Sequence, residues 1–139
     1  MNYLLDTDTC IYLMTDRVPQ RRERILAHLE SLRPETLVYL SSITVMELSY
    51  GAHKSRWSKA NLELLERFLL DFTIAGFDEP AAHRGGALRA VLEKKGKPIG
   101  PLDTLIAAHA LSLGATLVTN NVREFARVPE LHVKNWAEV

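Results

Sequence analysis

Residues 101–119, PLDTLIAAHALSLGATLVT, decide the fold class of this chain. The first thirteen have helical spacing after a proline, and Gly114 separates them from the short apolar run Thr116–Thr119, which is typical of a buried strand. The same alternation recurs along the chain. It predicts strands at Asn2–Leu5, Leu37–Leu40, Phe72–Phe77, Thr116–Thr119 and Leu131–Val133, and helices at Pro19–Leu32, Ile43–His53, Ser58–Asp71, Pro80–Lys95 and Pro101–Leu113. Such alternation predicts an α/β fold, a parallel sheet with helices on both faces.

Length and composition indicate one domain over residues 1–139. With 47% hydrophobic residues the chain can form a core without disulfides or a structural metal. Lysine plus arginine equals aspartate plus glutamate at 17 each, so any site for a polyanion must come from local clustering. The single cysteine excludes an internal disulfide and a multi-cysteine zinc site. The chain shows no signal peptide and no apolar run long enough to span a bilayer, which predicts a cytoplasmic protein.

Three acidic residues interrupt apolar segments near the predicted strand ends. Asp6 follows the first predicted strand, Glu47 lies within the second predicted helix, and Asp103 lies near the start of the last one. Because ligands of parallel sheets bind beyond the carboxyl ends of the strands, we expect these acids to converge in one cleft. Each also has a structural interpretation: Asp6 as a helix cap, Glu47 in a capping box with Thr44, and Asp103 as a favourable charge at a helix start.

Convergence of these carboxylates requires a counter-charge. Two carboxylates about 4 Å apart at an effective dielectric near 20 repel by about 4 kcal/mol, so either protons are shared or a divalent cation lies among them. A set of oxygen ligands without histidine or cysteine favours Mg²⁺ or Mn²⁺ over zinc. The five histidines show no metal-ligand spacing. A cation with an activated water suits attack on a phosphate ester.

Basic residues form three local groups: Arg17, Arg21, Arg22 and Arg24; Lys54, Arg56 and Lys59; and Lys94, Lys95 and Lys97. The last group shortly precedes Asp103, so we expect it to bring a phosphate backbone towards the metal. The other two are equally well interpreted as solvated helix faces. For Trp57, beside Arg56, a core or interface position is favoured over a base-stacking surface.

Four ordered motifs together resemble the PIN-domain family, and more closely the VapC-type toxins of bacterial toxin-antitoxin pairs. They are Tyr3-Leu4-Leu5-Asp6-Thr7, Ser41-x-x-Thr44-x-x-Glu47-Leu48, Gly100-Pro101-x-Asp103-x-x-Ile106-Ala107-Ala108-His109-Ala110 and Leu117-Val118-Thr119-Asn120-Asn121-x-Arg123-Glu124-Phe125. The resemblance runs from Met1 to about Trp136. It implies a three-layer α/β/α fold and a metal-dependent endoribonuclease that acts on cellular RNA such as tRNA.

The resemblance also implies roles for residues. Three members of the family's acidic quartet carry over to Asp6, Glu47 and Asp103, as ligands of Mg²⁺ or Mn²⁺. At the fourth position many relatives have aspartate where this chain has Asn121, and Glu124, one helical turn later, is the candidate for the missing carboxylate. RNA contacts are expected from Lys94, Lys95, Lys97, Thr119 and Asn120.

The family further implies a homodimer inhibited by a small VapB-type antitoxin, whose tail lies across the active groove and which alone contacts operator DNA. Two other interpretations stay open. Asp6-Thr7-Asp8-Thr9 also fits the Asp-x-Asp-x-Thr motif of haloacid-dehalogenase-type phosphatases, and the uncharged Asn120-Asn121 pair fits a PIN module that binds RNA without cleaving it.

Overall fold

The computed structural model describes residues 1–139 and contains one sheet of five parallel strands. The strands are β1 (Tyr3–Leu5), β2 (Val38–Ser41), β3 (Thr73–Ala75), β4 (Thr116–Val118) and β5 (Val133–Lys134), in the order β3-β2-β1-β4-β5. Central β1 pairs with β2 and β4, so that Leu4 lies opposite Tyr39 on one side and Leu117 on the other. Since all pairs are parallel, the carboxyl ends of the strands share one edge of the sheet.

Seven helices connect and cover the strands. They are α1 (Thr7–Met14), α2 (Pro19–Glu30), α3 (Ser42–Lys54), α4 (Ser58–Leu69), α5 (Glu79–Lys94), α6 (Pro101–Leu113) and α7 (Val122–Phe125). A proline in the first turn starts α2, α5 and α6, where its missing N–H costs no hydrogen bond. Gly114 ends α6 in the left-handed region with a φ of 62°, which glycine adopts without a steric penalty. None of the helices is both long and apolar enough to cross a membrane.

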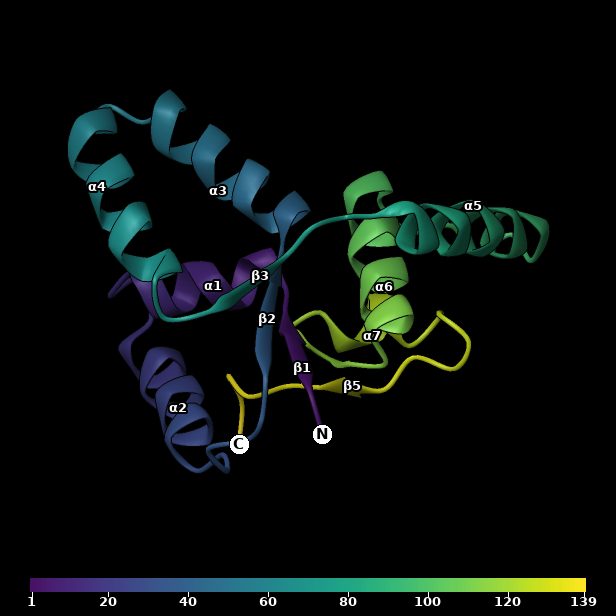
Figure 1. Ribbon diagram of the computed structural model, residues 1–139, viewed down its shortest axis with the longest axis horizontal. Helices are drawn as coiled ribbons and strands as arrows, with labels where there is room; N and C mark the ends of the chain where they lie inside the picture. The colour runs from purple at the N-terminus through teal and green to yellow at the C-terminus, as the bar shows by residue number, and fades with distance from the viewer.

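The alternation of side chains along β1 separates two apolar cores. Tyr3 and Leu5 pack with residues of α1, α2, α3 and α4, whereas Leu4 packs with residues of α5, α6 and α7. Figure 1 shows the same division, with α1, α2 and α4 on one side of the sheet and α5 and α6 on the other. The molecule therefore has the predicted helix, sheet and helix layers around a parallel sheet.

The predicted elements have ends within two residues of the observed ones, and the differences are local. Two helices, α1 and α7, were not among the predicted segments, because eight and four residues are too few to show a helical period. The capping box proposed for Thr44 and Glu47 is wrong. Ser41 caps α3 instead, its Oγ accepting a hydrogen bond from the Ile43 N–H at 3.0 Å.

Candidate active site

Asp6 lies at the carboxyl end of β1, the central strand, and is 5% exposed. It is also the N-cap of α1, where its Oδ1 accepts a hydrogen bond from the Thr9 N–H at 2.9 Å. Burial raises the pKa of Asp6 to about 6, against the opposing effect of hydrogen bonds from Thr119 and Thr9. The capping interpretation is therefore confirmed, and it places a buried carboxyl group at the edge where ligands of parallel sheets bind.

Glu47 projects from α3 towards the start of α1. The Thr7 hydroxyl donates a hydrogen bond to Glu47 Oε1 at 2.7 Å and lies 3.1 Å from the Thr44 hydroxyl. Thr7 directly follows Asp6, so its side chain fixes the carboxylate of one helix beside the carboxyl group that caps another. Sequence reasoning missed this role of Thr7, because nothing in the sequence indicates a bond between residues 40 positions apart.

Asp103 lies in the first turn of α6, half-buried and beside Glu124 of α7. Burial, a hydrogen bond with Glu124, and the charges of Glu124, Asp6 and Glu47 raise the pKa of Asp103 to about 7. Glu124 Oε1 accepts a hydrogen bond from the Gly100 N–H at 3.0 Å. A Cβ at position 100 would lie 3.4 Å from Asp103 Oδ2 and 3.9 Å from Glu124 Oε1, so the backbone of Gly100 lies directly against both carboxyl groups.

The segment after β4 completes this group of side chains. Thr119 is fully buried and accepts a hydrogen bond from the Asn121 N–H at 2.9 Å, while the Asn121 amide donates to Glu124 Oε2. Thr119 is thus a partner of Asp6 in the interior, not a side chain at the surface where sequence reasoning expected an RNA contact. Asn121 and Glu124 act together, because the amide holds the carboxylate beside Asp103.

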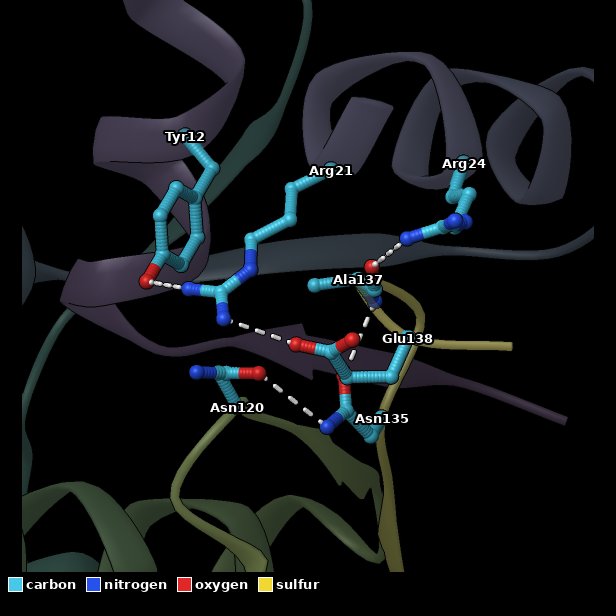
Figure 2. A network of polar contacts seen from close by, with 7 residues as sticks. All are labelled: Tyr12, Arg21, Arg24, Asn120, Asn135, Ala137 and Glu138. Carbon is cyan, nitrogen blue, oxygen red and sulfur yellow. Dashed lines mark hydrogen bonds and ion pairs between the residues drawn. The ribbon is translucent and has the colours of Figure 1, made fainter. Parts of the chain in front are cut away.

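Asn120 faces the C-terminal segment. Its Oδ1 accepts a hydrogen bond from Asn135 Nδ2 at 3.2 Å, and Figure 2 shows this pair beside Ala137 and Glu138. The segment is bound to α2 as well: Arg21 pairs with Glu138 at 2.9 Å, and Arg24 donates to the Ala137 carbonyl at 3.3 Å. These contacts place Asn120 in a structural network, so an RNA contact would compete with its bond to Asn135.

The acids thus gather at one edge of the sheet, as expected, from β1, α3, α6 and α7. No group of three or more His, Cys, Asp or Glu side chains is close enough, as placed, to enclose a metal ion. The donor set nevertheless fits a hard divalent cation, since it consists of oxygen atoms and two of its carboxyl groups have raised pKa values. Such carboxyl groups gain most from a nearby positive charge.

The three predicted phosphate-binding lysines lie at the end of α5. Lys94, Lys95 and Lys97 are all exposed, and none forms an ion pair with a carboxylate. They precede Gly100 and Asp103 by a few residues in the connection to α6. Their charges are therefore unpaired and available to a polyanion.

A buried histidine connects the two helices that carry Glu47 and Asp103. His109 of α6 is 1% exposed, and its Nδ1 lies 2.8 Å from the Oγ of Ser41, the N-cap of α3. Burial lowers the pKa of His109, against the charge of Asp78 and a hydrogen bond to the Gly76 backbone, so the ring is neutral near pH 7. A neutral ring that donates to the Gly76 carbonyl accepts at Nδ1 from the Ser41 hydroxyl.

Comparison with known proteins identifies the family. The PIN domain model matches residues 3–131. The chain is 41% identical to the tRNA(fMet)-specific endonuclease VapC of Salmonella typhimurium and 40% identical to Ribonuclease VapC2 of Rickettsia felis, in each case over 98% of both chains. The crystal structure of VapBC2 from Rickettsia felis bound to a promoter DNA fragment superposes with a TM-score of 0.90 at 39% identity, covering 98% of this chain and 99% of that one. The chain therefore belongs to the PIN domain family and, within it, to the VapC toxin endoribonucleases, whose family is typically metal-dependent.

Proposed function

We propose that residues 1–139 form a single PIN domain in which Asp6, Glu47 and Asp103 hold Mg²⁺ or Mn²⁺ for the hydrolysis of RNA. The observation that carries this proposal is the gathering of Asp6, Glu47, Asp103 and Glu124 at the carboxyl edge of the sheet, held by bonds from Thr9, Thr7 and Gly100. Burial and the other three carboxyl groups raise the pKa of Asp103 there. When bound, the cation supplies Lewis acidity and an activated water for attack on a phosphodiester.

The side chains of the cleft have different tasks in this proposal. Asp6 and Asp103 provide the negative charge that retains the cation. The bond from Thr7 orients Glu47, and the bonds from Gly100 and Asn121 orient Glu124. Groups held in this way need little rearrangement when substrate binds, which is the condition for efficient electrostatic stabilisation. Asn121 and Glu124 jointly fill the place of the family's fourth acid.

The substrate that we propose is tRNA, and the cytoplasm is then where the enzyme acts. The Salmonella typhimurium relative is a tRNA(fMet)-specific endonuclease, and this chain matches it over nearly its whole length. Lys94, Lys95 and Lys97 are the exposed cations that support binding of the RNA backbone beside Asp103. Thr119 and Asn120 support the site from within through their bonds to Asp6 and Asn135.

The partners that we propose are a VapB-type antitoxin and a second copy of the chain. The Rickettsia felis relative was crystallised as a VapBC2 complex on promoter DNA. For this chain, a basic side chain of the antitoxin placed among the acids would neutralise them and displace the cation. Operator DNA would then be contacted through the antitoxin alone.

The experiment that tests the proposal maps RNA ends. The purified chain is incubated with total tRNA and Mg²⁺, and the 5′ ends of the fragments are sequenced. We expect cleavage at discrete positions that disappears in EDTA and in the Asp103→Asn variant. Unchanged cleavage in EDTA would contradict the metal assignment, and binding of tRNA without fragments would favour the non-cleaving module.

The phosphatase alternative has lost its support. Its motif pairs Asp6 with Asp8, which is exposed in the first turn of α1 and whose charge, in addition to burial, helps to raise the pKa of Asp6. The groups that raise the pKa of Asp103 are instead Glu124, Asp6 and Glu47, which the phosphatase motif leaves without a role. The family comparison agrees with this correction.

A further inference from the structure

The turn between α3 and α4 carries an exposed group of aromatic and basic side chains, here named the α3–α4 platform: Tyr50, Lys54, Arg56, Trp57 and Lys59. Tyr50 is 61% and Trp57 67% exposed, so of the core and interface positions favoured for Trp57 from the sequence, the core position is wrong. Lys54 Nζ lies 5.7 Å from the centre of the Tyr50 ring, and the Arg56 guanidinium lies 5.3 Å from that of Trp57. Each exposed ring is thus paired with a cation.

The cations of the platform form no ion pairs. Residues 48–62 contain no aspartate or glutamate, and the flanking acids, Glu47 and Glu63, leave Lys54, Arg56 and Lys59 unpaired. The arginines of α2 differ, because Arg21, Arg22 and Arg24 bind Glu138 and the carbonyl groups of Leu13 and Ala137. The platform is therefore a local positive surface on a chain of zero net charge.

The platform is continuous with the active site along α3. Tyr50 and Lys54 follow Glu47 by three and seven residues, so all three lie on one face of the helix. At 1.5 Å per residue, Lys54 is about 10 Å along the axis from Glu47. An RNA strand with one phosphate at the acids would therefore reach the platform within a few nucleotides.

We propose that the α3–α4 platform binds the RNA strand beside the cleaved phosphodiester, an inference that rests on the proposed function. Tyr50 and Trp57 stack on unpaired bases, while Lys54, Arg56 and Lys59 contact phosphates. Tyrosine, tryptophan and arginine are common to protein interfaces and RNA-binding surfaces, but lysine is depleted at protein interfaces, so Lys54 and Lys59 favour RNA over a protein partner.

Binding is measured with a fluorescent RNA stem-loop and the full chain carrying Asp103→Asn, which leaves the probe intact. Lys54→Gln/Arg56→Gln/Lys59→Gln should weaken binding at low salt by about tenfold or more and reduce the slope of log K against log salt by about 2, since each lost contact to a single strand removes about 0.7. Trp57→Ala should weaken binding about fivefold or more. The control Arg17→Gln/Arg33→Gln/Arg84→Gln, which removes three exposed arginines elsewhere, should bind like the parent.

Cleavage gives a second measurement that a general loss of structure would not mimic. In a chain with all its acids, the platform triple variant should raise KM and leave kcat unchanged. Equal affinity and salt slope in the triple variant and the parent would overturn the proposal. So would a change from dimer to monomer in sedimentation, which would make the platform a contact between copies. If the platform binds RNA but the parent cleaves none, the proposed function alone is wrong.

Discussion

At the scale of single residues, a structural and a chemical role coincide in Asp6. Its side-chain oxygen caps α1 through the Thr9 N–H, and its charge acts on Asp103 in the acidic site. In Asp6→Asn the amide oxygen still accepts the Thr9 bond, so the protein should fold, whereas the lost charge should lower RNA cleavage about a thousandfold. Initial rates in Mg²⁺ together with a thermal melt test both parts.

Asp8→Asn is the matched control, since Asp8 is exposed two positions along the same chain. We expect its cleavage rate to stay within about twofold of the parent, because surface changes of this kind have small effects. Mg²⁺-dependent cleavage that persists in Asp6→Asn would remove Asp6 from the metal site. Equal losses in both variants would restore the phosphatase interpretation.

Glu124 is the second residue for which the structure sharpens an expectation. It contacts the Gly100 N–H, the Asn121 amide and Asp103, which are the contacts of a side chain that adjusts the site from its edge. Glu124→Ala should therefore lower activity less than Asp103→Ala does, and raised Mg²⁺ should partly restore it. Titration of the rate against Mg²⁺ checks this. Equal losses that Mg²⁺ does not restore would make Glu124 a direct ligand.

At the scale of elements, the site depends on how α3 and α6 are held together. His109 joins them through Ser41, and both side chains are fully or almost fully buried. His109→Leu leaves the buried Ser41 O–H without its acceptor, while Ser41 Oγ still accepts from the Ile43 N–H, and should lower the free energy of unfolding by about 1 to 3 kcal/mol. His109→Asn, whose amide can donate and accept, should lose less. Chemical denaturation distinguishes the two, and equal losses would show that packing alone is involved.

The sequence was sufficient for the elements but not for the contacts between them. Short apolar runs predicted the strands, and prolines at the starts of helices helped to predict the helices. Because the strands are parallel, Asp6 and the residues after β4 had to lie at the same edge of the sheet. The partners of the acids could not be predicted, because the bond from Thr7 to Glu47 joins residues 40 positions apart. For Trp57 the residue type favoured a core or interface position, and the structure places it exposed in the turn between α3 and α4.

At the scale of the whole molecule, the acidic site makes stability depend on pH. The pKa of Asp6 in the folded chain is about 6, against 3.8 in the unfolded one, so the unfolded chain loses this proton first as pH rises. Metal-free protein should therefore lose stability between about pH 4 and pH 6, by about 3 kcal/mol from Asp6 alone. Asp103, which is half-buried, should extend the loss towards pH 7. Denaturant midpoints across this range in EDTA test the direction, and a rise in stability would contradict it.

Repulsion among the carboxylates also predicts that the metal-free parent is less stable than a variant that lacks one of these charges. In EDTA above pH 7, Asp103→Asn removes a charge that faces Glu124, Asp6 and Glu47, so its melting temperature should exceed that of the parent. Mg²⁺ should then reverse the order. It stabilises the parent by about 2.7 kcal/mol at a hundred times Kd, because only the folded chain presents the site, and this gain should shrink sharply in the variant. A variant that melts below the parent in EDTA, with equal shifts in Mg²⁺, would show that Asp103 is only a favourable charge at the start of α6. Its raised pKa would then no longer argue for a metal site.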